Sequence, residues 1–142
     1  MRRLITLAAL LAAPAFMPAF AGLKEDAKAQ CVVISTAGIA LPEGTPPDQV
    51  AQVSQSIETW CGCFTDKVST LGPDGDIVLT VLANTTPEEA MAGANDPAKD
   101  KEITIGIAKR EAGLSDADAE AWYARIDPQV KAMTQSCAAA VK

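Results

Sequence analysis

The sequence contains no histidine, and this absence removes a large part of enzyme chemistry. Histidine is the side chain that most readily moves protons near neutral pH, so histidine-dependent triads and proton shuttles are excluded. The chain also lacks a Gly-x-Ser-x-Gly elbow, a glycine-rich phosphate loop and a Ser-x-x-Lys box. We therefore expect a protein that is not an enzyme and that has no cofactor.

Positive charge is also scarce. Beyond residue 21 the chain has 18 acidic and 10 basic residues, since Arg2 and Arg3 come earlier, and its net charge is therefore −8. An acidic protein without a basic face does not bind phosphate backbones or anionic membranes, so nucleic acid is not an expected partner. One group of basic residues alternates with acidic ones, as on a solvated helix face: Lys99, Lys101, Lys109 and Arg110.

The N-terminal residues 1–21 have the pattern of a cleaved signal peptide. Arg2-Arg3 precede a short apolar run, and Ala19-Phe20-Ala21 is a small-x-small cleavage site before Gly22. The run is too short to span a membrane. We expect residues 22–142 to form one exported domain, periplasmic or secreted, with no membrane span after cleavage.

The exported part carries four cysteines: Cys31, Cys61, Cys63 and Cys137. An even number of cysteines in an oxidising compartment predicts two disulfides. Cys61 and Cys63 lie two residues apart, so on a helix they point about 200° from each other. A bond between them does not suit helical geometry, because a relaxed disulfide places its Cβ atoms about 3.8 Å apart. Each is expected to bond to another element.

The stretch from Thr45 to Leu71 organises the predicted fold. Its apolar residues recur in steps of three and four, the spacing of one buried helical stripe: Val50, Val53, Ile57, Trp60, Phe64, Val68 and Leu71. Thr45 is the expected N-cap and Gly72-Pro73 the expected end. A helix over about residues 23–40 precedes it. The two helices are expected to pack as an antiparallel hairpin, with Cys31 and Cys61 at similar heights along it. This favours a Cys31–Cys61 bond and leaves Cys63 to bond with Cys137. The pairing of Cys31 with Cys63 stays open.

The sequence pattern of the second half of the chain predicts several short helices followed by a long last helix. Residues 72–75 read as a turn, and Ile77–Leu82 is ambiguous between strand and helix; we favour a short buried helix because no other segment offers a strand to pair with. Thr86 starts a helix with a capping box, and Gly93 ends it. Asp96 caps a helix to about Ala112.

Ser115 starts the last helix, whose buried stripe includes Trp122, Ile126 and Cys137. Pro128 should kink or split this helix near Asp127. Trp122 belongs to the core, whereas Tyr123 should face outward as a possible contact surface. The expected fold class is thus all-α: a small disulfide-stapled bundle of five or six helices around one long central helix.

No metal site is expected. Asp74-Gly75-Asp76 lacks the remaining ligands of an EF-hand loop, and Asp116, Asp118 and Glu120 suit the positive end of a helix. These observations favour a non-enzymatic binding or accessory protein of the bacterial envelope, acting on an unidentified protein partner. Two alternatives remain: a redox or metal-handling protein using Cys61-Gly62-Cys63, which needs accessible thiols, and a carrier of a small apolar ligand, which needs an internal pocket.

Overall fold

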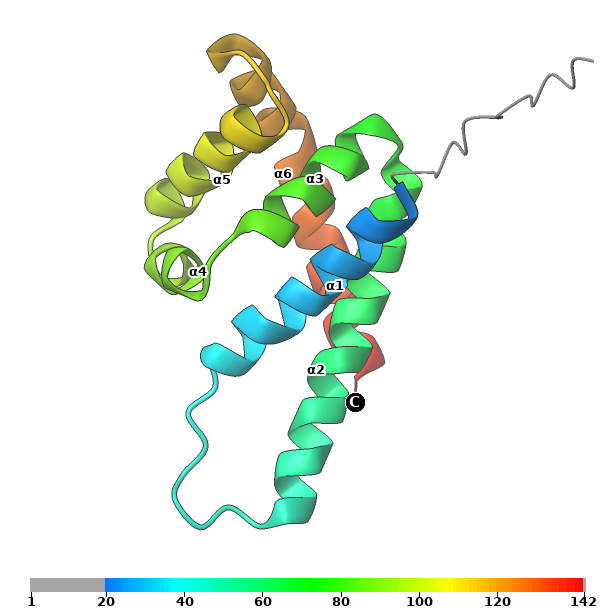
Figure 1. Cartoon of the computed structure of the whole chain (residues 1–142), viewed down its shortest axis with the longest axis vertical. Coiled ribbons are helices and arrows are strands. Elements are labelled where there is room, and N and C mark those ends of the chain that lie inside the picture. The colour runs from blue at the N-terminus through cyan, green and yellow to red at the C-terminus, as the bar shows by residue number, and fades with distance from the viewer. Residues whose placement is uncertain (1–19, 142) are drawn as a thin grey trace, which may run out of the picture.

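A computed structural model describes residues 20–141, and the expected signal peptide lies outside the described residues apart from its last two. The described part is all-α, as predicted, and contains no strand. Its elements are α1 (Phe20–Ala37), α2 (Pro47–Val68), the 3₁₀ turn η1 (Ser69–Leu71), α3 (Pro73–Asn84), α4 (Pro87–Ala94), α5 (Pro97–Glu111) and α6 (Asp116–Ala140) (Figure 1).

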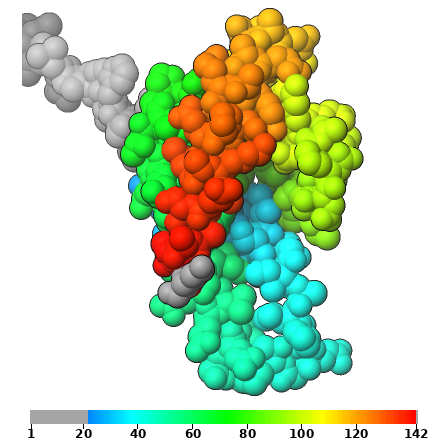
Figure 2. Space-filling view, turned by 180° about the vertical axis from the view of Figure 1, so that it is seen from behind, coloured from blue at the N-terminus to red at the C-terminus, as the bar shows by residue number. Residues whose placement is uncertain are grey.

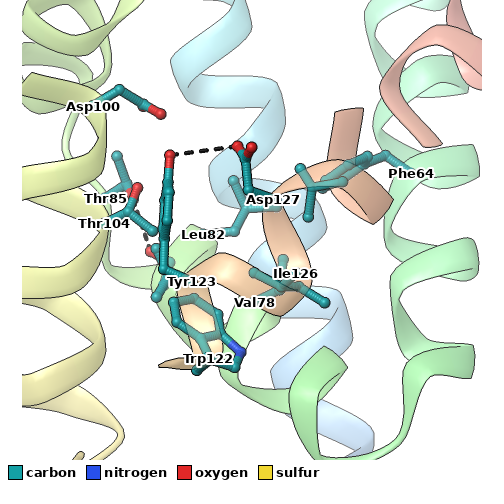
Figure 3. A pocket seen from close by; sticks show the side chains of 12 residues that line it. Phe64, Val78, Leu82, Thr85, Asp100, Thr104, Trp122, Tyr123, Ile126 and Asp127 are labelled. Atoms are coloured by element: carbon teal, nitrogen blue, oxygen red, sulfur yellow. Dashed lines mark hydrogen bonds between the residues drawn. The ribbon is translucent and has the colours of Figure 1, made fainter. Parts of the chain in front are cut away.

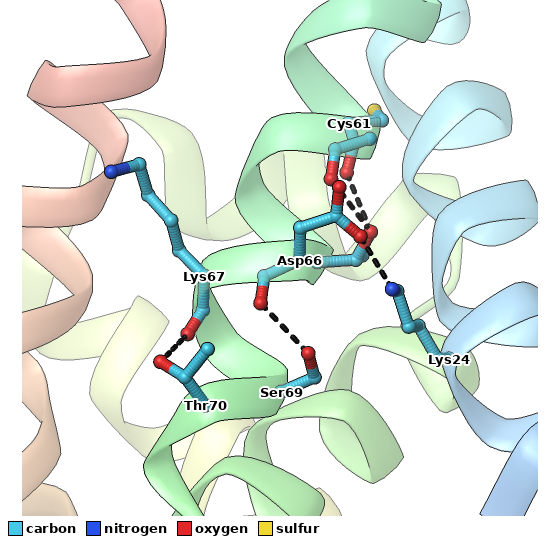
Figure 4. Close-up of polar contacts among 8 residues, drawn as sticks. Lys24, Cys61, Asp66, Lys67, Ser69 and Thr70 are labelled. Carbon is cyan, nitrogen blue, oxygen red and sulfur yellow. Dashed lines mark hydrogen bonds and ion pairs between the residues drawn. The ribbon is translucent and has the colours of Figure 1, made fainter.

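Helix α2 lies at the centre of the arrangement, with α1 and α6 packed against different sides of it (Figure 1). Ile57, Phe64 and Val68 of its predicted stripe are buried, and so is Cys61 beside the stripe. Thr65 is buried too, and its hydroxyl donates to the Cys61 carbonyl at 2.9 Å, so no polar atom is left without a partner there. On the surface, Lys24 of α1 forms an ion pair with Asp66 (Figure 4).

The start of α2 differs from the sequence prediction. Thr45 does not cap the helix; its hydroxyl donates to the Pro42 carbonyl at 2.6 Å, and Pro46 occupies the N-cap position without a side-chain hydrogen bond. The cause is local, because a residue that precedes proline is pushed to extended backbone. Pro46 precedes Pro47 and has φ −57° and ψ 143°, so the helix begins only at Pro47.

The predicted turn over residues 72–75 is wrong beyond its first residue, since Pro73, Asp74 and Gly75 form the first turn of α3. Gly72 makes the sharp change of direction with φ +62°, a conformation that L side chains rarely adopt. Gly75 is buried, and a Cβ there would overlap the Val68 carbonyl oxygen. This close approach lets α3 begin directly against the end of α2. The ambiguous segment Ile77–Leu82 is helical, as favoured.

Helices α4 and α5 begin as the sequence predicts. Thr86 and Glu89 form a capping box, with Thr86 N–H donating to Glu89 at 2.9 Å and Glu89 N–H donating to Thr86 at 3.2 Å. Asp96 accepts from Ala98 N–H and Lys99 N–H. Gly93 does not end α4, which continues to Ala94; it is buried where Asp100 of α5 lies close to it. A Cβ at Gly93 would lie 3.1 Å from the Cα of Asp100, so the glycine permits the close packing of α4 on α5.

Ser115 caps α6, and Pro128 does not split it: α6 is one helix from Asp116 to Ala140. Proline removes one N–H from the helix and crowds the preceding turn. One neighbouring carbonyl gains a side-chain partner, because the Gln129 amide donates to Arg125 O at 3.1 Å. α6 runs along the back of the molecule (Figure 2), and the end of the α1–α2 hairpin projects beyond it. No helix within residues 20–141 is long and apolar enough to cross a membrane.

Candidate functional site

The four cysteines form two disulfides that both start from α2. Cys31 of α1 is bonded to Cys61, and Cys63 is bonded to Cys137 of α6; this is the pairing that the helix heights favoured. The Cα–Cα distance is 5.8 Å in each, within the usual range. Cys61 and Cys137 have no exposed surface, Cys31 is 3% exposed and Cys63 is half-buried. Two such bonds indicate a small helical protein of a non-reducing compartment.

Of the five acidic residues considered as cation ligands in the sequence, four have side-chain partners in the structure: Asp74, Asp116, Asp118 and Glu120. Asp74 accepts two hydrogen bonds from the Arg125 guanidinium, at 3.0 and 3.3 Å. Asp116 forms an ion pair with Lys109, and Asp118 accepts from the Ser115 hydroxyl at 2.6 Å. In the part of the chain that the structure describes, no group of three metal-ligating side chains comes together.

A pocket of about 200 Å³, partly open to solvent, lies between α3, α5 and α6 (Figure 3); we call it the central pocket. Its walls are mainly apolar. Phe64 of α2 is one of the apolar wall residues. The others come from α3 and α6: Val78, Val81, Leu82, Trp122, Ile126 and Val130. The Trp122 ring is fixed by its N–H, which donates to the Asp74 carbonyl at 3.3 Å. At about 30 Å³ per water, the space corresponds to roughly seven water molecules.

The mouth of the central pocket is polar and acidic. Figure 3 shows Tyr123 standing in the pocket with its hydroxyl directed toward the carboxylates of Asp127 and Asp100. The hydroxyl donates to Asp127 Oδ1 at 3.4 Å. Desolvation raises the pKa of Tyr123 to about 12, and the negative charges of Asp127 and Asp100 and the hydrogen bond to Asp127 contribute to the rise. The tyrosine is therefore a neutral phenol at ordinary pH.

Asp100 is the more unusual of the two carboxylates. Desolvation raises the pKa of its carboxyl above the ordinary value, Asp127 adds to the rise, and Lys131 opposes it. Among the described residues Asp100 takes part in no ion pair, whereas Asp127 is bonded to Lys131 at 2.7 Å. Negative charge at the mouth is thus only partly compensated.

Two lysines lie next to residues of the mouth, and both are already paired: Lys131 with Asp127 and Lys101 with Glu120. Lys101 lies 5.8 Å from the centre of the Tyr123 ring and forms an ion pair with Glu120 at 2.7 Å. Lys99 pairs with Glu102 and Arg110 with Glu111, so the interleaved charges of α5 are paired as on a solvated face. The chain itself therefore places a cation near the tyrosine ring.

Sequence reasoning missed this site. We expected Tyr123 to face outward, but it is half-buried because α5 packs across it. Asp100 belongs to the charges that alternate on the expected solvated face of this helix; it is exposed, as expected, but it also lines the pocket, which was not expected. The available signal was the spacing of Tyr123 and Asp127, four residues apart and therefore on one helix face, next to the stripe of Trp122 and Ile126. The partner residues on α5 are set by tertiary packing, which the sequence pattern does not encode.

Comparisons with protein-family models, with curated proteins and with solved structures find no match for this chain. The fold and the site thus define a class only: a small all-α protein with two disulfides and a partly open apolar pocket that has an acidic mouth.

Proposed function

We propose that this is a non-enzymatic binding protein of the bacterial envelope, periplasmic or secreted, that holds a small ligand in the central pocket. The observation that carries the proposal is the preformed pocket, in which apolar walls converge with a few polar groups at the mouth. The exported location rests on the two disulfides and on the signal-like residues 1–21. The size of the pocket limits the ligand to a small molecule, below the usual range for drug-sized ligands.

The absence of enzymatic activity is part of the proposal. The polar groups at the mouth are a neutral phenol and two carboxylates, and the raised pKa of Tyr123 makes it a poor nucleophile and a poor base. The disulfides support a structural role for the cysteines over the redox and metal-handling alternatives, because a thiolate is what attacks a disulfide or binds zinc.

A pocket-filling substitution tests the proposal. Thr104 is half-buried and lines the pocket from α5, so Thr104→Phe should fill it, while Thr59→Phe on the exposed face of α2 is the matched control. We expect native mass spectrometry of protein purified from the periplasm to find a small adduct in the wild type and in Thr59→Phe but not in Thr104→Phe. If no variant carries an adduct, and no compound of about seven non-hydrogen atoms raises the melting temperature, the proposal is wrong.

A second candidate function is that of an accessory protein that docks on another protein. The observation that favours it is a set of exposed apolar side chains in the α1–α2 hairpin: Ile39, Leu41 and Val50, from 38% to 43% exposed, lie in its connecting segment and at the start of α2, and Val33 within α1 is 51% exposed. Chemical cross-linking in the periplasm tests it. Ile39→Asp with Leu41→Asp should abolish the cross-linked product if this surface binds a partner, and an unchanged product would exclude the surface.

A further inference from the structure

The charge at the mouth of the central pocket restricts what the pocket accepts. Asp100 and Asp127 approach it from two different helices, and Tyr123 stands with its hydroxyl toward them (Figure 3). An anion entering here would meet two carboxylates. The Asp100 carboxylate is exposed at the mouth and has no ion-pair partner among the described residues, so beside a neutral molecule it would be solvated by water alone, whereas a cation would pair with it.

The cations near the mouth do not occupy the pocket. Lys131 pairs with Asp127 from the solvent side, and its side chain is 70% exposed. Lys101 is shared between Glu120 and the neighbourhood of the Tyr123 ring. Exposed ion pairs of this kind contribute little, about 0–1 kcal/mol, so a cation in the pocket can compete with Lys131 for Asp127.

The side chains that line the pocket favour an organic cation over a metal ion. A metal ion needs several oxygen ligands at short range, and the described residues bring no such group together here. An organic ammonium group is large and weakly hydrated, and it is attracted to aromatic faces as well as to carboxylates. Leu82 and Ile126 offer its carbon atoms an apolar surface below the mouth.

We propose that the central pocket binds a small organic cation, a quaternary or alkylated ammonium compound, with its charged head between Asp100 and Asp127 beside Tyr123 and its carbon atoms against Leu82 and Ile126. This inference rests on the proposed function, since it specifies the ligand of the same pocket. About seven non-hydrogen atoms is the size that the pocket volume allows.

A matched pair of probes tests the charge directly. Choline and 3,3-dimethylbutan-1-ol have nearly the same shape, but the alcohol has carbon in place of the charged nitrogen. We expect titration calorimetry of the disulfide-bonded protein near pH 7 to give choline an affinity at least about ten-fold higher than the alcohol. Asp100→Asn should remove most of this preference and leave the affinity for the alcohol unchanged. Asp26→Asn, on the exposed face of α1, makes the same charge change away from the pocket and should preserve the preference.

The outcomes separate the inference from the proposed function. If choline and its neutral analogue bind equally, and Thr104→Phe abolishes both, the pocket binds ligands but the charge argument is wrong. If neither probe binds and the native adduct is absent, the proposed function fails as well.

The ionisation of Tyr123 offers a second test. A bound cation should change the apparent pKa of Tyr123, whereas a purely structural role of the two aspartates would leave it unchanged. Tyr123 is the one tyrosine of the chain, so its ionisation is followed in ultraviolet absorption without overlap from another phenol. A quaternary cation keeps its charge at high pH, and it should lower the apparent pKa of Tyr123 from about 12, whereas the neutral alcohol should not lower it. An apparent pKa that is unchanged at saturating choline would place the cation elsewhere and overturn the inference.

Discussion

Two sides of the molecule are held together by different means. Helices α1, α2 and α6 are joined by covalent bonds, because each disulfide starts from α2 and ends on one of its two neighbours. Helices α3, α4 and α5 have no covalent link to the rest apart from the chain itself. They are held by apolar packing in the shared core, by caps, by close glycine contacts and by side-chain hydrogen bonds. We call α1, α2 and α6 the stapled side and α3, α4 and α5 the unstapled side. The central pocket lies where the two sides meet, between α6 of the stapled side and α3 and α5 of the unstapled side.

The difference shows how a small domain fixes a site without enclosing it in cross-links. On the unstapled side, α3 is tied to its neighbours at both ends. Asp74 binds Arg125 and accepts from Trp122, and the Gln30 amide donates to the Thr85 carbonyl at 2.6 Å. Each of these hydrogen bonds holds one end of α3, and α3 forms one wall of the pocket. The disulfides instead act on the unfolded chain, by limiting its conformational freedom.

Removing a disulfide should be the largest perturbation of all. The Cys63–Cys137 bond spans 74 positions and Cys31–Cys61 spans 30, so the chain-entropy relation gives about 4.5 and about 3.7 kcal/mol as upper figures. We expect alanine replacement of either pair to lower the free energy of unfolding in urea, with the larger loss for Cys63 and Cys137. Reduction of both should melt or greatly loosen the fold. A reduced sample with unchanged helicity and melting temperature would contradict this.

Gly75→Ala tests the unstapled side most severely. The added methyl group overlaps the Val68 carbonyl, a backbone atom that cannot turn away, so we expect a loss near the upper end of overpacking costs, about 3 kcal/mol. Gly106→Ala is the matched control, because a Cβ there meets nothing within 4 Å and alanine favours the helix. Chemical unfolding measures both. Equal effects of the two substitutions would remove the argument for a tight α2–α3 approach.

A cap substitution should have a smaller effect. Thr86→Ala removes the hydroxyl that accepts from Glu89 N–H in the capping box of α4, and we expect a loss of about 1 kcal/mol. Thr45→Ala should change stability by less than about 0.5 kcal/mol, because Thr45 caps no helix and its hydroxyl donates only within the loop, to the Pro42 carbonyl. Thermal unfolding of the two variants compares them. A larger loss for Thr45→Ala would indicate that the sequence-based cap at Thr45 is correct after all.

The pH dependence of Tyr123 should be the most local effect. Its pKa is about 12 in the folded protein and about 10 in the unfolded chain, so the folded state holds the phenolic proton more tightly. The associated stabilisation is complete below pH 10 and is lost as the pH rises toward 12. Ultraviolet titration of the native and the urea-unfolded protein measures the two pKa values. Two equal values would mean that Tyr123 faces solvent, as the sequence alone suggested.

The sequence predicted those features that depend on neighbouring residues in one helix. The apolar stripe from Val50 to Leu71 predicted the central helix, and the roughly opposite directions of Cys61 and Cys63 favoured separate partners. Thr86 and Ser115 mark helix starts because a cap is a local hydrogen bond. The features that were missed depend on contacts between distant segments. The burial of Gly75 requires Val68 against it, and the position of Tyr123 requires α5 to lie across α6.

The connectivity of the two disulfides has a mechanical consequence. A pulling force applied to Cys31 and Cys137 passes through Cys61, Gly62 and Cys63, and the remaining intervening chain carries none of it. Both loops are therefore shielded from tension, and the central pocket with them. A single proteolytic cut within either loop likewise leaves the two pieces joined by a disulfide, as long as the protein stays in a non-reducing compartment.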